Sequence, residues 1–358
     1  MSAPTVARAI VFDPATRELD PRDIPVREPR SGEILVRVRL SAICGSDLHT
    51  IRGRRDPGGP LVLGHEICGE VAALGDGADA DSLGAPLSIG DRVTWGIAAS
   101  CGNCFFCARG IPQKCVRLFK YGHAPLESDT PLGGGFAEYC HLVPGTAVYR
   151  IPEDLPDREV VFANCSLATM QAAVRMADVR AGESVLIQGA GLVGLCATAL
   201  CADRGASPVV VADPCEERLT QAQSFGATHL ACAGDLRDFT EDVRGFDVAI
   251  EACGHPGAIG DGIEALRIGG RYIAAGCVYP GAIAQIDMLS ITTKLITLQG
   301  LHNYTPLDLQ EALRFLTRAG RRFPSASVVR EVLPLEEIED ALALMEGDPS
   351  ILRVALSP

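Results

Sequence analysis

The chain has 358 residues, and its 45 acidic and 32 basic side chains give a formal net charge of −13 at pH 7. This charge argues against nucleic acid or an anionic membrane as the main partner. The length is sufficient for two domains, each with its own core. Fourteen cysteines without a secretory signal at the start favour metal ligands and buried thiols in a cytoplasmic protein over disulfides.

Two patterns of apolar residues divide the chain. Residues 1–166 contain short apolar runs between Gly and Pro turns, which predicts a mainly β domain in the form of a partly open barrel. Residues 167–299 alternate buried strands with helices and predict a doubly wound, parallel α/β sheet. Residues 300–358 contain two helical segments and a last strand, and we expect them to return to the first domain. The buried parallel strands are expected at 185–187, 209–211, 248–250 and 272–274.

A cysteine and a histidine with acidic neighbours stand out in the first domain. Cys44 opens the segment Cys-Gly-Ser-Asp-Leu-His, and His65 lies between Gly64 and Glu66. Thiolate and imidazole are common zinc ligands, and nearby carboxylates can support them. Each residue alone fits a buried cysteine or a structural histidine at least as well, so the interpretation depends on the rest of the chain.

Four cysteines follow in a short loop. Their spacings are 3, 3 and 8 residues, and the four are Cys101, Cys104, Cys107 and Cys115. Four thiolates this close can surround one Zn²⁺ tetrahedrally with no open position, so such a site is expected to be structural. A redox CxxC pair, an iron–sulfur cluster and a disulfide are the alternatives, but the grouping of three plus one favours zinc.

A glycine-rich turn begins the second domain's sheet. Gly189-Ala190-Gly191-Leu192-Val193-Gly194 follows an apolar strand and opens an apolar helix, so a dinucleotide pyrophosphate is expected at the helix N-terminus. Since these glycines interrupt the longest apolar run, we expect a buried strand, turn and helix there and no membrane span. Asp213 ends the next strand and favours NAD over NADP by repelling a 2′-phosphate, whereas Arg218 keeps NADP open.

With these motifs in this order, the chain resembles the zinc-dependent medium-chain alcohol dehydrogenases. The resemblance covers nearly the whole chain and includes the segment Gly64-His65-Glu66-Ile67-Cys68-Gly69-Glu70. It implies a GroES-like catalytic domain, a Rossmann domain that binds NAD, two zinc ions per chain, and a homodimer or homotetramer. The tract Arg52-Gly53-Arg54-Arg55 and the segment 300–304 further resemble dehydrogenases associated with bacterial phosphonate use.

The resemblance also implies roles for individual residues. Cys165 matches the third ligand of a catalytic zinc beside Cys44 and His65, and Thr169 matches a nicotinamide contact. The other implied roles are a proton relay of Ser46 and His49, supporting carboxylates at Asp47 and Glu66, and a pyrophosphate contact at Arg353.

The expected reaction is hydride transfer between an alcohol or carbonyl substrate and NAD. Zinc eases loss of the hydroxyl proton, and the relay residues carry that proton outward. Three arginines at 52–55 indicate an anionic substrate such as a hydroxyalkyl phosphonate, since guanidinium pairs well with oxyanions. Alternatively, these side chains face solvent or a neighbouring subunit, and the substrate is a neutral polyol or secondary alcohol.

Two other classes of protein remain as alternatives. A zinc-free reductase of the same fold would lack Cys44, His65 and Cys165 together, and all three are present. A non-catalytic nucleotide-binding protein would show altered ligands or a broken glycine turn, and the sequence has neither change.

Overall fold

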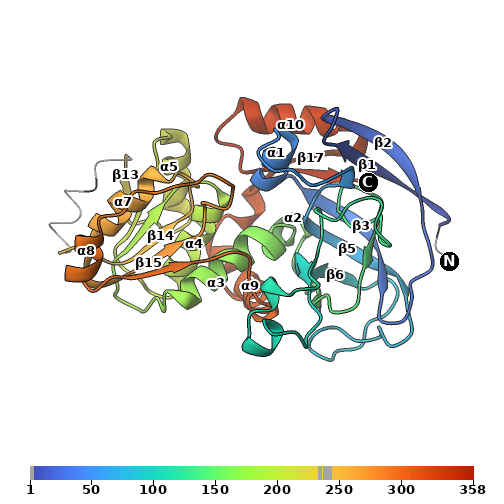
Figure 1. Cartoon of the computed structure of the whole chain (residues 1–358), viewed down its shortest axis with the longest axis horizontal. Coiled ribbons are helices and arrows are strands. Elements are labelled where there is room, and N and C mark those ends of the chain that lie inside the picture. Colours follow the sequence, from blue (N-terminus) through green and yellow to red (C-terminus); the bar gives the residue numbers. More distant parts are fainter. Residues whose placement is uncertain (1–3, 233–235, 237–243) are drawn as a thin grey trace. The chain divides into compact units, whose positions relative to one another are not determined.

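The computed structural model describes residues 4–232, 236 and 244–358, which divide into two compact units (Figure 1). The first unit contains residues up to Cys165 together with Thr305–Thr317 and Ala326–Pro358. The second contains Ser166–Tyr304 and Arg318–Ser325. Residues 300–304 and the short segment Arg318–Ser325 therefore group with the second unit, whereas the sequence led us to expect all of 300–358 in the first.

The first unit is built mainly of antiparallel strands. One sheet has the order β2-β1-β4, and the larger one has the order β10-β6-β5-β3-β18-β17, with β9 also paired to β3. A small ribbon joins β7 and β8. The strands are β1 (Val6–Asp13), β2 (Glu18–Pro25), β3 (Ile34–Ala42), β4 (Leu61–Val62), β5 (Glu66–Leu74), β6 (Arg92–Trp95), β7 (Ala98–Ala99), β8 (Phe119–Lys120), β9 (Tyr139–Leu142), β10 (Val148–Arg150), β17 (Val329–Pro334) and β18 (Arg353–Ser357). The helices of this unit are α1 (Gly45–Ile51), α2 (Asp157–Val160), α9 (Pro306–Ala319), whose last two residues are grouped with the second unit, and α10 (Ile338–Gly347).

Side-chain alternation explains how these strands pack. In β3, Val36 and Val38 are buried while Arg37 and Arg39 are exposed, as expected for a strand with one face on a core. A second core of this unit joins the two ends of the chain, since β1 packs with Ile338 and other apolar residues of the C-terminal segment. In Figure 1 the red α10 and β17 accordingly lie with the blue β1 and β2.

The second unit is a parallel sheet with helices between its strands. Its strand order, β13-β12-β11-β14-β15-β16, is that of a Rossmann fold. The strands are β11 (Val185–Gln188), β12 (Val209–Ala212), β13 (His229–Ala231), β14 (Phe246–Glu251), β15 (Leu266–Ala274) and β16 (Thr297–Gly300). The helices are α3 (Ala168–Met176), α4 (Leu192–Asp203), α5 (Glu216–Ser224), α7 (Gly257–Glu264) and α8 (Met288–Thr293). Across the described residues, no helix is both long and apolar enough to span a membrane.

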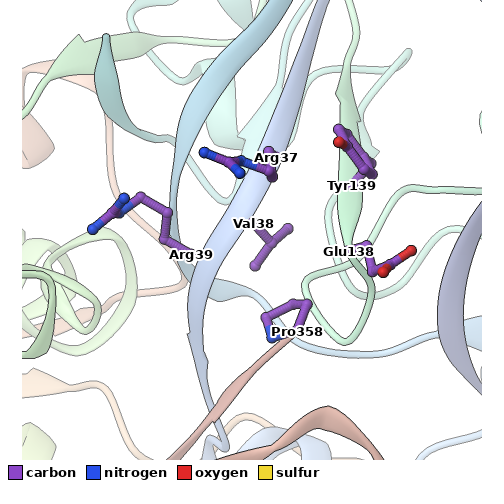
Figure 2. A pocket seen from close by; sticks show the side chains of 6 residues that line it. All are labelled: Arg37, Val38, Arg39, Glu138, Tyr139 and Pro358. Atoms are coloured by element: carbon purple, nitrogen blue, oxygen red, sulfur yellow. The ribbon is translucent and has the colours of Figure 1, made fainter. Parts of the chain in front are cut away.

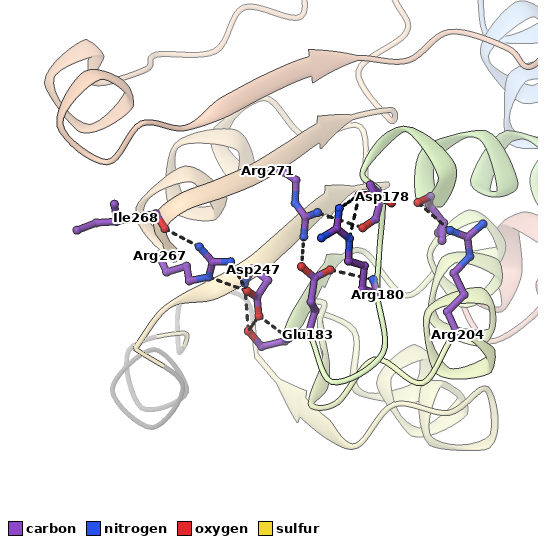
Figure 3. Close-up of polar contacts among 10 residues, drawn as sticks. Asp178, Arg180, Glu183, Arg204, Asp247, Arg267, Ile268 and Arg271 are labelled. Carbon is purple, nitrogen blue, oxygen red and sulfur yellow. Dashed lines mark hydrogen bonds and ion pairs between the residues drawn. The ribbon is translucent and has the colours of Figure 1, made fainter.

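Ionic and polar contacts gather where the strands of this sheet begin (Figure 3). The carboxylate of Asp247 accepts hydrogen bonds from the backbone and side chain of Ser184, both at 2.8 Å, and from Arg267 at 2.6 Å. Arg271 pairs with Glu183 at 2.5 Å. Partly exposed pairs of this kind contribute about 0–1 kcal/mol each. Because they lie at the amino ends of the strands, the carboxyl ends stay available for a ligand.

Candidate metal and cofactor sites

Three ligand atoms converge in the first unit. The side chains of Cys44, His65 and Cys165 offer donor atoms that all lie within 4.8 Å of one another. The two sulfur atoms are 4.0 Å apart. Tetrahedral zinc with Zn–S bonds of about 2.3 Å separates two thiolates by about 3.8 Å, so the pair fits that metal. Three protein donors leave one coordination position for another ligand.

Asp47 holds two of these three residues in place. Cys44 immediately precedes α1, and its backbone N–H donates to the Asp47 carboxylate at 2.8 Å. The other carboxylate oxygen lies 3.2 Å from Nδ1 of His65, and both side chains are only 1% exposed. A carboxylate on Nδ1 leaves Nε2 as the ligating nitrogen. Asp47 therefore has the supporting position that the sequence implied.

The charges around the site favour a thiolate at Cys44. A hydrogen bond from the Cys165 thiol lowers the pKa of Cys44 well below its ordinary value, and His65 and Arg353 add to this effect. Burial opposes a charge on His65, but Asp47 and the Cys44 thiolate raise its pKa to about 10. A bound metal replaces the protons that this donor set otherwise holds.

A buried ion pair lies directly behind Cys44. Arg353, the first residue of β18, donates to both carboxylate oxygens of Glu66 at 2.7 Å, and both side chains are at most 7% exposed. The same guanidinium lies 3.7 Å from the Cys44 sulfur, and its remaining nitrogen donates to the Leu352 carbonyl at 2.7 Å. Arg353 is thus placed at the metal site, and its contact with a pyrophosphate stays a prediction.

The four cysteines of the loop also form one group. Their donor atoms lie within 4.8 Å of one another. Four of the sulfur–sulfur separations are 3.4, 3.4, 3.9 and 4.0 Å. These distances agree with a four-thiolate tetrahedron and are far longer than a disulfide bond of about 2.05 Å. The loop has little core of its own, since Phe105 and Phe106 are exposed.

The glycine turn at the carboxyl end of β11 has the geometry of a dinucleotide site. Gly189 has φ +108°, in the region that favours glycine, and a Cβ on Gly194 would lie 1.8 Å from the Gly189 carbonyl oxygen. A Cβ on Gly191, which caps α4, would meet no atom within 4 Å. The space over Gly191 is therefore open to a close approach by a pyrophosphate.

Asp213 connects this turn to β12. Its two carboxylate oxygens accept from the backbone N–H groups of Ala190 at 2.7 Å and Cys215 at 2.8 Å. The side chain lies just past the end of β12, where a ribose is bound in Rossmann folds. The structure thus adds a second role that the sequence did not indicate, because Asp213 also fixes the glycine turn.

Comparisons with known proteins agree with this geometry. Residues 30–153 match the alcohol dehydrogenase GroES-like domain, and residues 193–318 match the zinc-binding dehydrogenase domain. A 5-exo-hydroxycamphor dehydrogenase of Pseudomonas putida is 29% identical over 351 residues, covering 95% of this chain and 96% of the relative. An L-threonine 3-dehydrogenase of Xanthomonas euvesicatoria is 30% identical over 353 residues, with coverages of 95% and 96%. The chain belongs to the zinc-dependent medium-chain alcohol dehydrogenase family.

Solved structures confirm the expected fold class of the dehydrogenase. An alcohol dehydrogenase from Thermotoga maritima has a TM-score of 0.91 at 27% identity and covers 99% of this chain and 100% of its own. Two others have 25% identity and the same coverages: an alcohol dehydrogenase of Escherichia coli CFT073 complexed with NADH (TM-score 0.86) and a zinc-binding dehydrogenase of Sinorhizobium meliloti 1021 bound to NADP (TM-score 0.85).

Asn164 is a site residue of the dehydrogenase that the sequence did not single out. It lies in a π-helical turn, Ala163–Leu167, next to the ligand Cys165. Its fully buried amide donates to the carbonyls of His65 at 3.0 Å and Trp95 at 2.9 Å, and accepts from the N–H of Ile67 at 3.3 Å. It therefore ties the segments of two ligands together. The sequence did contain a signal for this role, since the polar Asn164 directly follows the apolar residues 160–163. A buried amide requires hydrogen-bond partners, so a polar residue at the end of an apolar run indicates a structural contact.

Replacing Asn164 by Ala is expected to destabilise the first unit by about 3 kcal/mol, because three buried backbone groups lose a partner. Zinc retention should also fall, since the segments of His65 and Cys165 lose their connection. Urea unfolding followed by fluorescence of Trp95, the chain's one tryptophan, reports the first unit. Asn103→Ala is the matched control, because Asn103 makes an exposed hydrogen bond. Equal losses in the two variants would contradict this role.

The remaining predicted site residues lie where their motifs place them. Ser46 Oγ lies 3.0 Å from Nε2 of His65, and His49 stands one turn further along α1. In the second unit, Thr169 is half-buried on α3 and Arg218 is half-buried on α5. Leu192 and Val193 form the first turn of α4, directly after the glycine turn. The cofactor roles of these last four residues stay predictions.

The arginine tract after α1 is not one cluster. Arg52 pairs with Glu346 at 2.6 Å and so has a partner on α10. Arg54 approaches Nδ1 of His49 at 3.4 Å. Arg55 is half-buried, and its charge acts on both His49 and Lys120. Only the second half of the tract is therefore oriented toward the relay residue.

A pocket of about 540 Å³ lies elsewhere in the first unit (Figure 2). None of its lining residues is a metal or cofactor candidate, and its arginines already have acidic partners. Arg37 pairs with Glu70 at 3.0 Å, and Arg39 pairs with Asp157 at 2.7 Å. We assign no part of the reaction to this pocket.

Proposed function

We propose that the chain is an NAD-dependent dehydrogenase with two zinc ions, and that its alcohol substrate carries an anionic group. The main support is the three-donor group of Cys44, His65 and Cys165, which leaves one coordination position for a substrate. The same chain also has the Rossmann glycine turn. The four-cysteine group would hold the second, structural zinc.

The chain's own residues prepare the site for hydride transfer. When bound, zinc acts as a Lewis acid and eases loss of the substrate's hydroxyl proton. Ser46 is positioned beside the ligand set to receive that proton, and His49 on the same helix passes it outward. The Asp47 carboxylate lies against Nδ1 of His65, and the guanidinium of Arg353, paired with Glu66, lies against the Cys44 sulfur.

His49→Gln tests the relay through pH. Burial lowers the pKa of His49, and Arg54 and Arg55 lower it further, so the imidazole is neutral at pH 7 and can accept a proton. The wild-type rate should therefore decline only below about pH 6.5. The variant should lose about 100-fold in kcat at pH 7, the lower end of what general-base catalysis contributes, with a smaller loss at pH 9 where hydroxide replaces the base. A loss that does not change with pH would rule out the relay role.

Asp213→Asn tests the choice of cofactor. The amide oxygen can still accept from Ala190, but the amide nitrogen cannot accept from Cys215, so the glycine turn keeps one of its two bonds to this side chain while the charge that repels a 2′-phosphate is gone. We expect kcat/KM with NAD to fall about tenfold and the preference over NADP to narrow. Steady-state kinetics with both cofactors measures this. If the wild type prefers NADP, Arg218 and not Asp213 would be the residue that determines the choice of cofactor.

Two observations bear on the substrate. Arg54 and Arg55 favour an anionic group, and one relative is named for L-threonine, a zwitterion whose carboxylate lies on the carbon next to the one that bears the hydroxyl. The other relative, named for 5-exo-hydroxycamphor, favours a neutral secondary alcohol and keeps that candidate open. An anionic substrate is the better match to the charges, since guanidinium and oxyanion form charge-assisted hydrogen bonds.

Zinc analysis and a substrate panel test the proposed function together. The panel contains hydroxyalkyl phosphonates, L-threonine, neutral polyols and secondary alcohols, with absorbance at 340 nm as the readout. We expect two zinc ions per chain and the highest kcat/KM with an anionic member. Turnover of neutral members only would select the secondary-alcohol alternative, and one zinc ion or none would contradict the metal assignment.

We also propose that the dehydrogenase forms a homo-oligomer in the cytoplasm. The edge strand β16 is exposed along its whole length, and Ile283, Leu289 and Leu295 of the same unit are 68–83% exposed. An exposed edge strand with apolar neighbours is a site for pairing, and a second copy of the chain presents the same surface. Light scattering of the purified protein tests this. A thiol-rich composition supports a reducing compartment.

A further inference from the structure

A short segment of the first unit passes against the metal ligand His65. The strand β8 ends at Lys120, and the chain then turns through Gly122 to His123. A Cβ on Gly122 would lie 2.7 Å from the Gly64 carbonyl oxygen and 3.2 Å from Cβ of His65. The ring centroids of His123 and His65 are 5.4 Å apart. Pairing of Lys120 with Ala98 on β7 holds the segment in this position.

Lys120 lies in this segment without a polar partner. Its side chain is half-buried, and among the described residues its ammonium has no recorded hydrogen bond or ion pair. Lys294 behaves differently, since its ammonium donates to two carbonyls at 2.6 and 3.2 Å. A desolvated ammonium without a partner is unfavourable, so a lysine of this kind is suited to a charged ligand.

The charges around Lys120 have one prevailing sign. Its pKa is lowered to about 8, mainly by burial and in addition by the nearby charges of Arg55 and Lys114. The thiolates of Cys165 and Cys44 oppose this effect, and in a loaded site their charge is committed to the metal. The positive charges of Lys120 and Arg55 act on His123 as well. An anionic ligand would therefore provide the counter-charge for the Lys120 ammonium.

We propose that Lys120 binds the anionic group, a carboxylate or a phosphonate, of the substrate whose hydroxyl lies at the Cys44, His65 and Cys165 site. This inference rests on the proposed function and names the residue that selects the substrate class. An ammonium offers three donors and suits both oxyanions, which share this chemistry. Gly122 and His123 of the same segment pack against His65, and the charges of Cys44 and Cys165 act on Lys120, so its ammonium lies near the ligand set, where the reacting hydroxyl has to be bound.

The test uses zinc- and NAD-loaded enzyme and ligands that cannot be oxidised. Calorimetry measures binding of propylphosphonate and of butyrate to the wild type, Lys120→Met and Lys120→Arg. We expect Lys120→Met to weaken both anions about 10- to 100-fold and Lys120→Arg to stay within about threefold, since it keeps the charge. Arg22→Met is the control, because it removes one positive charge from an exposed pair on β2. It should leave binding unchanged.

Kinetics separates this inference from the proposed function. In Lys120→Met, kcat/KM for a hydroxyalkyl phosphonate should fall by the same factor as binding, while a neutral alcohol of equal carbon count stays within about twofold. Zinc content and the unfolding midpoint should match the wild type. If the wild type prefers anions and Lys120→Met still binds them, the role of Lys120 is wrong. If the wild type binds neither anion, the anionic substrate class is wrong and the Lys120 inference with it.

Discussion

Cys165→Ala is expected to abolish turnover while the first unit stays folded. The variant loses one of the three proposed protein ligands of the catalytic zinc. Loss of a residue that only supports a ligand already lowers metal affinity or activity about 10- to 100-fold, so a larger loss is expected here. Folding should change little, because Cys165 is half-buried and its recorded side-chain contact is with the sulfur of Cys44. Turnover, zinc per chain and Trp95 fluorescence during urea unfolding measure the three consequences.

Two other cysteine variants complete this experiment. Cys104→Ala should lower stability or solubility before it affects chemistry, because a loop with so little core would depend on the proposed second zinc for order. Cys140→Ala removes a fully buried thiol that is no ligand, so it should cost about 1 kcal/mol and leave turnover intact. If Cys165→Ala keeps both zinc and activity, the assignment of the three-donor group is wrong.

The metal groups and the glycine turn could be predicted because each depends on residue type and short spacing. Thiolates and imidazoles are favoured zinc ligands, and the four cysteines of the loop are close in sequence. The glycine turn is equally local, since Gly189 and Gly194 meet across a single strand-to-helix turn. The central strands were recognisable because full burial makes them continuous apolar runs.

Other features could not be predicted because they depend on the register of distant segments. Arg353 and Glu66 are 287 positions apart, and only the sheet that contains β5 and β18 brings them together. Arg52 likewise pairs with a residue that is distant in sequence, Glu346. It therefore does not act together with Arg54 and Arg55. The edge strands β13 and β16 lack the buried apolar runs that marked the central strands, because they are less covered.

Glu66→Gln and Arg353→Met are expected to destabilise the first unit unequally. Removing one member of a buried ion pair costs about 3–5 kcal/mol when the other charge stays. Glu66→Gln leaves the buried guanidinium of Arg353 without its charged partner. Because this group cannot lose its proton, the full loss of stability should appear at every pH. In Arg353→Met the carboxyl group can take up a proton, and burial already raises the pKa of Glu66.

The pH dependence of Arg353→Met follows from that raised pKa. A carboxyl group whose pKa is higher in the folded than in the unfolded chain stabilises the fold below the unfolded value of about 4.3, and this contribution is lost as pH rises. Arg353→Met should therefore be less stable at pH 8 than at pH 5, whereas Glu66→Gln should change little between them. Urea unfolding followed by Trp95 at both pH values measures each variant, and the double variant should recover at least about 2 kcal/mol of the summed losses. Additive losses, or equal pH profiles, would mean that the two side chains do not act as one pair behind Cys44.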